Sequence, residues 1–114
     1  AVFNKVGGVW LQDGLPLYSP EAPPNSYQGV KVELSADGNT LIFSGNNGSP
    51  TDEGFMVVYI YQDGNWVPAQ QLIGGVPTDY TLIGMTPSLS SDGSTLAAAT
   101  FPLPGDFSYV ITYE

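Results

Sequence analysis

The residue types that most often carry out catalysis are scarce in this chain. Its 114 residues include no His and no Cys, and Lys5 and Lys31 are the only basic side chains. Acid–base or nucleophilic chemistry would therefore depend on paired carboxylates, such as Asp52 and Glu53. A single acidic pair in a loop beside Pro50 is more typical of a solvated turn, because charged side chains are mostly exposed. We expect no enzymatic activity.

The same inventory argues against a metal or a cofactor. Zinc is held by His and Cys ligands, and the sequence contains neither. Calcium takes about six to eight oxygen ligands. The loop of residues 45–54, the best candidate for a cation site, offers only Asp52 and Glu53 as charged ligands. We expect no metal site and no cofactor.

Aromatic and amide side chains could instead bind sugars. Trp10 and Trp66 are the candidate glycan contacts, because sugars stack on exposed rings. Both tryptophans occupy the same position of an internal repeat, so packing between repeat units also accounts for them, and we favour that interpretation. Asn47 begins the one glycosylation sequon, although Pro50 directly after the sequon weakens it as an acceptor. Glycans remain a candidate partner.

Charge and hydropathy narrow the range of other partners. The net charge is −9, with eleven acidic residues against two basic ones. Nucleic acid is excluded as a partner because phosphate binding requires clustered Lys and Arg, and anionic membrane surfaces are disfavoured for the same reason. The longest apolar runs fall far short of the roughly 20 residues that span a bilayer, so we expect no membrane insertion.

The N-terminal residues favour secretion. The first residue is Ala, and no charged segment followed by an apolar run precedes it. We therefore expect an extracellular or cell-surface protein whose signal peptide has been removed. A trimmed chain would begin in the same way, and the lack of Cys leaves the redox compartment open.

The sequence predicts strands and no helix. Short runs rich in Val, Ile, Tyr and Thr alternate with turn dipeptides such as Asp37-Gly38 and Asp63-Gly64, and no helical stripe of apolar residues occurs. Asp-Gly supplies the positive φ that tight hairpins need. We expect nine strands, near residues 2–6, 9–12, 29–34, 40–45, 56–62, 65–72, 84–89, 95–101 and 107–113.

An internal repeat organises these strands. Residues 29–41 return 55 positions later as residues 84–96, with the Ser-x-Asp-Gly turn and a following Thr-Leu kept. Residues 2–10 match residues 58–66, which belong to the second half of the repeat. The segment 109–113 resembles 57–61 in turn. The chain therefore contains one complete repeat between two partial ones.

The complete repeat resembles a known family. The residues that carry the likeness are Ser35, Asp37-Gly38-Asn39-Thr40-Leu41, Val57–Tyr61, Trp66 and Gln70-Gln71-Leu72. They are similar to the FG-GAP-like repeats of bacterial and integrin-type β-propellers, in which one repeat forms one blade. The loop 45–54 departs from the integrin type, whose calcium loop is dense in Asp. About two blades cannot close a ring, since propellers generally use four to eight.

The resemblance and the strand pattern together predict the architecture. We expect a single all-β domain over residues 1–114, with a partial blade at 1–28, a complete blade at 29–83 and a second partial blade at 84–114. Each blade would be a four-stranded antiparallel meander. The incomplete terminal sheets would be completed by neighbouring protomers, because repeat units bury their faces only against neighbours.

This architecture predicts self-assembly. We expect a secreted structural subunit that associates with copies of itself, head to tail, into an extracellular filament or fibre. The alternative is an oligomeric β-propeller lectin that binds glycans between blades, and an isolated fragment of a larger propeller is a third interpretation. The predicted self-assembly residues lie in the two terminal segments: Val2, Phe3, Val6, Trp10, Tyr109, Ile111 and Tyr113.

Overall fold

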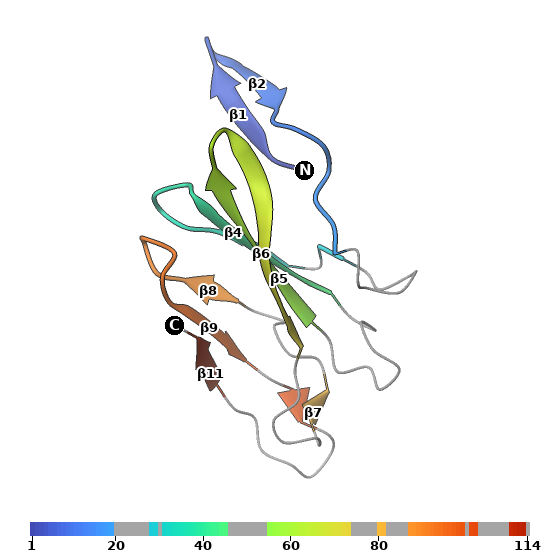
Figure 1. The fold of residues 1–114 in the computed structure, drawn as a ribbon. Coiled ribbons are helices and arrows are strands. Elements are labelled where there is room, and N and C mark those ends of the chain that lie inside the picture. The colour runs from blue at the N-terminus through green and yellow to red at the C-terminus, as the bar shows by residue number, and fades with distance from the viewer. Residues whose placement is uncertain are drawn as a thin grey trace.

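The protein is all-β, as the sequence predicts. The computed structural model describes residues 1–19, 28–29, 31–45, 55–73, 80–81, 87–99, 101–102 and 110–113. Every regular element in these ranges is a strand, and every strand pair is antiparallel (Figure 1). Within the described part of the chain, no helix is long and apolar enough to cross a membrane.

The largest sheet is the predicted meander of the complete repeat. It joins β3 (Val32–Leu34), β4 (Thr40–Gly45), β5 (Phe55–Gln62) and β6 (Asn65–Ile73) in the order β3-β4-β5-β6. The β5–β6 turn is tight because Asp63 and Gly64 adopt φ of 53° and 82°, as a two-residue hairpin requires. The strand predicted at residues 29–34, which is the first of the complete repeat, begins later than expected, because Gly29 lies in a turn with φ of 88°.

A second sheet reproduces the first three strands of the repeat. It contains β8 (Ser88–Leu89), β9 (Leu96–Ala99) and β11 (Val110–Tyr113) in the order β11-β9-β8. The predicted strand 84–89 is thus shorter than expected, while residues 107–109 of the predicted strand 107–113 lie outside the described residues. Among the described residues, no fourth strand pairs with β11, whereas β6 pairs with its counterpart β5.

A two-stranded ladder of β7 (Tyr80–Thr81) and β10 (Phe101–Pro102) was not predicted. The predicted strand 95–101 is divided between β9 and β10. A proline is tolerated here because the ladder has only two strands, and both are therefore edges.

A separate hairpin is formed by β1 (Phe3–Val6) and β2 (Val9–Gln12). Gly7 and Gly8 close it with φ of 56° and 83°, matching the turn between β5 and β6. All eight strand residues are exposed. The hairpin extends past the β5–β6 turn in Figure 1, and no other described strand lies beside it.

The core occupies both faces of the four-stranded sheet. Because neighbouring residues of a strand point to opposite faces, the apolar run in β4 supplies both faces, as expected for an interior strand. One face joins Ile42 and Met56 to Leu96 and Ala98 of the second sheet, with Val58 and Leu89 packed against them. The other face comprises Leu41, Phe43, Phe55, Val57 and Tyr59, packed against Val2, Leu17 and Trp66.

Candidate assembly interface

The β1–β2 hairpin exposes apolar side chains on both of its faces. In its register, Lys5 stands opposite Trp10 on one face and Val6 opposite Val9 on the other. A two-stranded hairpin is marginally stable in water on its own, and exposed apolar patches commonly mark interaction surfaces. The exposed fractions are 52% for Phe3, 59% for Val6, 59% for Val9, 64% for Trp10 and 52% for Leu11.

The two tryptophans hold equivalent positions but have different surroundings. Trp66 is half-buried, lies against Tyr61 with 5.2 Å between ring centroids, and packs on the core. Its indole nitrogen is buried and has no hydrogen-bond partner among the residues that the structure describes. Trp10 has the Lys5 ammonium 5.9 Å from its ring centroid and remains 64% exposed. Core packing therefore accounts for the position of Trp66, while Trp10 has no core to enter within the described chain.

The base of the hairpin is held firmly although its strands project. The Asp13 N–H donates to the Val2 carbonyl over 2.8 Å, and the Asn4 amide donates to the Asp13 carboxylate over 2.8 Å. Further along, the Tyr59 hydroxyl donates to the Tyr18 carbonyl over 2.6 Å. The hairpin is therefore fixed to the four-stranded sheet through the segment that follows it.

The second sheet ends on an open edge. Strand β11 pairs with β9 on one side, and no described strand pairs with its other side. Such an edge offers unpaired N–H and C=O groups to another strand. Of the predicted assembly residues, Ile111 and Tyr113 lie in this strand, while Tyr109 lies outside the described residues.

The two Ser-x-Asp-Gly turns have the same hydrogen bonds. In the first, the Ser35 hydroxyl donates to Asp37 Oδ1 over 2.6 Å, and the Asn39 N–H donates to the same oxygen over 2.9 Å. The Thr40 N–H donates to Ser35 Oγ over 3.0 Å. The bonds to Asp37, with that from Ser35 strongest, hold the pKa of its carboxyl below the usual value.

The second turn repeats this pattern with Ser90 and Asp92. The Ser94 N–H and hydroxyl and the Ser90 hydroxyl all donate to Asp92 Oδ1, over 3.0, 2.7 and 2.9 Å. The Ser94 N–H contributes most, and together they lower the pKa of Asp92 to about 2. Both aspartates thus stabilise turns, which is the structural role that their equivalent repeat positions predict.

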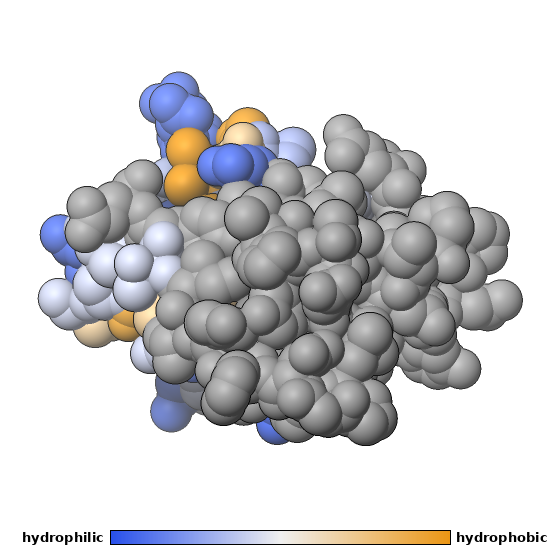
Figure 2. All heavy atoms as spheres, turned by 90° about the horizontal axis from the view of Figure 1, so that it is seen from below, coloured by the Kyte–Doolittle hydropathy of each residue, from blue (hydrophilic) through white to orange (hydrophobic). Residues whose placement is uncertain are grey.

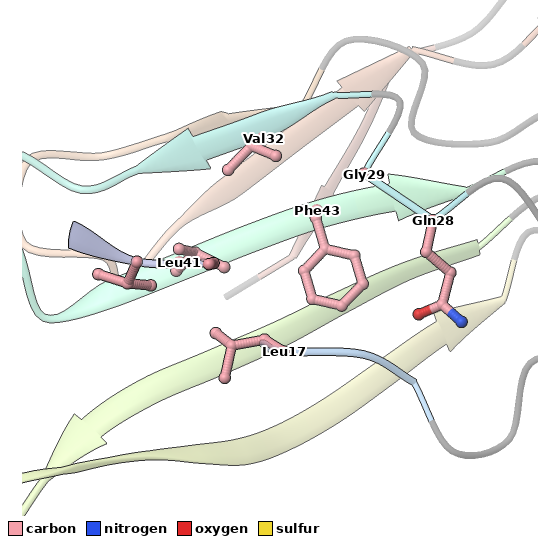
Figure 3. A pocket seen from close by; sticks show the side chains of 8 residues that line it. Leu17, Gln28, Gly29, Val32, Leu41 and Phe43 are labelled. Carbon is pink, nitrogen blue, oxygen red and sulfur yellow. The ribbon is translucent and has the colours of Figure 1, made fainter. Parts of the chain in front are cut away.

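Two hollows flank the segment between the hairpin and β3. The first, of about 150 Å³, is mainly apolar, and Figure 3 shows Leu17 and Phe43 converging on it. Its lining comprises Ala1, Val2, Leu17, Gln28, Gly29, Val32, Leu41 and Phe43. Without a charged side chain in the lining, this hollow suits an apolar side chain better than a sugar.

The second hollow, unlike the first, has a charged side chain in its lining. It measures about 310 Å³ and brings Asp13 and Asn65 next to Trp66. Leu15, at its rim, is 83% exposed. Sugar-binding sites commonly combine an aromatic ring with a carboxylate and an amide. This hollow is therefore the candidate site for the glycan alternative.

Asn47, Asp52 and Glu53 lie outside the described residues. Within the described part, no three His, Cys, Asp or Glu side chains are grouped so that they could hold a metal ion. In the view of Figure 2, the described residues, which are coloured, include hydrophobic ones at the surface next to hydrophilic ones.

Sequence reasoning missed several exposed apolar residues. Val9 and Leu11 belong to the predicted hairpin and could have been added from their place in it. Val32 and Leu34 of β3 are 59% and 50% exposed, and no sequence signal distinguishes them from residues of a covered face. These residues extend the candidate interface from the hairpin to the four-stranded sheet.

A scan of family models, a search of curated proteins and a search of solved structures found no match to this chain. The likeness to FG-GAP-like repeats therefore rests on the sequence motifs alone and stays a prediction. Fold by itself is a weak guide to activity. The functional proposal must accordingly come from the surfaces described above.

Proposed function

We propose that this chain is a secreted structural subunit that assembles head to tail into an extracellular filament. In this assembly the β1–β2 hairpin of one copy completes the β8-β9-β11 sheet of a neighbouring copy. The observation that carries the proposal is the hairpin itself, whose apolar side chains remain exposed on both faces, Trp10 at 64%. Burial of such side chains is the main driving force for association.

The donor and the acceptor together contain every strand of the repeat, with the third strand present twice, as β1 and as β11. The hairpin corresponds in sequence to β5–β6, and β6 supplies the pairing that β11 lacks among the described strands. Addition of a strand to an open edge satisfies backbone groups of both partners. Because the donor and acceptor surfaces differ, each copy can bind one neighbour at each end, which generates a ring or a filament.

A single chain cannot readily make this contact with itself. Val2, at the base of the hairpin, packs on one face of the four-stranded sheet, whereas Leu89 and Leu96 pack on the other face. The four-stranded sheet therefore lies between the hairpin and the open edge. Completion of the sheet by the hairpin favours a second copy.

Charge substitutions in the hairpin test the proposal. Trp10→Asp and Leu11→Asp should leave folded monomers, because a buried unpaired carboxylate in the contact is strongly unfavourable. Val67→Asp is the matched control, since Val67 is the counterpart of Leu11 on the complete sheet and is 37% exposed. Sedimentation velocity and negative-stain microscopy report assembly, and circular dichroism reports folding. Assembly of the hairpin variants at wild-type size would refute strand completion.

The extracellular location is tested separately. Immunogold labelling of intact cells should decorate surface or released filaments. Label confined to the cell interior would contradict this part of the proposal while leaving self-assembly itself untouched.

The second candidate function is glycan binding at the hollow beside Trp66. The observation favouring it is the convergence of Asp13, Asn65 and Trp66. Screening against a glycan array should then reveal binding that Asn65→Ala removes and Val67→Asp retains. Absence of any binding by assembled protein would leave the structural role alone.

A further inference from the structure

The contact between the two sheets of this chain includes their Ser-x-Asp-Gly turns. The Asp37 N–H donates to the Ser91 carbonyl over 3.0 Å, which links the first turn to the second. Gly93 lies so close to Thr40 that a Cβ at this glycine would overlap the Thr40 side chain. Thr40 is only 7% exposed as a result. One turn therefore stacks directly on the next.

Side chains below the turns continue the same contact. On the second sheet, Leu96 and Ala98 enter the core, with Leu89 packed beside them. On the four-stranded sheet they meet Ile42 and Met56. The contact thus consists of a backbone hydrogen bond, a close glycine and an apolar face.

The four-stranded sheet carries an equivalent face on its other side. Leu34, Leu41 and Phe43 stand 55 positions before Leu89, Leu96 and Ala98, and they belong to the face opposite Ile42. Leu41 and Phe43 are buried, with Val2 and Leu17 packed against their cluster, so the exposed part of this face is its β3 edge, where Leu34 is 50% exposed. The apolar hollow of about 150 Å³ opens beside it (Figure 3).

The backbone groups that join the two turns have repeat equivalents, and these equivalents make no such hydrogen bond among the described residues. Among the described residues, neither the Ala36 carbonyl nor the Asp92 N–H forms a hydrogen bond with another residue. These are the groups equivalent to Ser91 and Asp37, which bond to each other within the chain. A Cβ built on Gly38, the equivalent of Gly93, meets nothing within 4 Å.

We propose that a second copy of this chain stacks its β8–β9 turn on the first turn and on the exposed β3 edge of this face, and so repeats the internal turn contact between copies. The Asp92 N–H of one copy donates to the Ala36 carbonyl of the other, and Gly38 closes over Thr95. Ala97, the counterpart of Ile42, faces Leu34. The inference rests on the proposed self-assembly and names the surface that receives the second copy.

The stacking direction agrees with strand completion. The hairpin of the receiving copy is attached on the same side of its four-stranded sheet, because Val2 packs on that face. The stacked copy would therefore bring its open β11 edge into the layer of the hairpin. A single contact between two copies would then bring their turns together and also place the hairpin of one copy beside the β11 edge of the other.

Crosslinking tests the turn contact directly, because the chain has no Cys of its own. One full-length chain would carry Ala36→Cys and another Ser91→Cys, and the two would be mixed with a short bis-maleimide. We expect a covalent dimer that appears only in the mixture. The control mixture pairs Ala36→Cys with Gln70→Cys, an exposed position in the outer strand β6 that is paired with Val58, away from the turns. Equal dimer yields in both mixtures would overturn the inference.

A glycine pair provides an independent test. Gly38→Ala and Gly64→Ala impose similar backbone strain, since φ is 76° and 82° and neither Cβ meets an atom within 4 Å. Only Gly38→Ala should weaken assembly, by at least tenfold in the association constant, through overlap with Thr95 of the other copy. Equal effects of the two variants would refute the stacked contact.

The two proposals can fail separately. If Trp10→Asp gives monomers while the glycine pair behaves alike and the paired cysteines do not crosslink, strand completion stands and the stacking surface is wrong. If the cysteines crosslink selectively while Trp10→Asp assembles normally, the stacking surface is right and strand completion is wrong.

Discussion

The hairpins β5–β6 and β1–β2 are built alike but have different surroundings. Each places a Trp at the second position after the turn and closes with two residues of positive φ, Asp63-Gly64 in one and Gly7-Gly8 in the other. The first is paired to β4 and contributes to a buried face, whereas every strand residue of the second is exposed. Local sequence therefore suffices to form the hairpin, and burial depends on what lies beside it.

The largest contrast should come from the equivalent pair Tyr59 and Phe3. Tyr59 is 6% exposed and donates a hydrogen bond to the Tyr18 carbonyl, while Phe3 is 52% exposed. Tyr59→Ala should reduce the free energy of unfolding by about 3–5 kcal/mol, by cavity formation in the core. Phe3→Ala should reduce it by less than about 1 kcal/mol in the monomer. Chemical denaturation of dissociated protein measures both, and equal losses would contradict the contrast.

The two turn glycines should differ next. Gly93→Ala combines left-handed backbone strain with overlap on Thr40, so a loss of about 2–4 kcal/mol in unfolding free energy is expected. Gly38→Ala carries the strain without the overlap and should cost about 1 kcal/mol in the monomer. Thermal unfolding of the two variants checks the difference. If the Gly38→Ala monomer were as unstable as the Gly93→Ala monomer, the loss of unfolding free energy would come from backbone strain and not from overlap with Thr40.

Trp10 should matter only when copies meet. Trp10→Ala removes a ring that is 64% exposed, so the monomer's unfolding free energy should hardly change. In the assembly the ring becomes an interface anchor, and its loss should weaken association by about 2 kcal/mol, on the order of thirtyfold. Concentration-dependent sedimentation measures the effect. Unchanged association would place Trp10 outside the contact.

Much of the fold could be predicted from the sequence because its signals are local. The Asp-Gly turns fix the positions of the hairpins, and the unbroken apolar run of β4 requires cover on both faces, which Leu96 on one face and Leu17 on the other help to provide. The repeat placed Ser35 and Ser90 in equivalent turns, and their hydrogen bonds agree.

The remaining features depend on tertiary context that no local pattern encodes. The exposure of Val32 and Leu34 was not predictable, because a strand of alternating apolar residues does not reveal whether its apolar face has a neighbour. Pairing of Pro102 with Tyr80 could not be predicted, because Pro cannot donate to a ladder and is rare in strands. The hollow beside Trp66 is formed by segments far apart in sequence and has no sequence signature.

Acid should strengthen association without opening the turns. At neutral pH the net charge of −9 separates copies, and this repulsion disappears near the sequence pI of about 4.1. The Asp92 carboxylate stays ionised at pH 4, because its folded pKa of about 2 lies below its ordinary 3.8, so its turn keeps its hydrogen bonds there. A carboxylate with a lowered pKa contributes stability that is present above the ordinary value and is lost as the pH falls through the folded value. The turns therefore stay intact at pH 4, where association should peak.

Light scattering between pH 7 and pH 4 measures this last and smallest effect, with circular dichroism recorded in parallel. Scattering should rise towards pH 4 while the β spectrum is unchanged, and salt at pH 7 should act in the same direction by screening. Trp10→Asp separates specific assembly from general precipitation, since it should remain monomeric at pH 7 in high salt. Flat scattering in the wild type would show that surface charge does not control how the hairpin and the open edge meet. In that case the difference between the two hairpins would reflect packing alone.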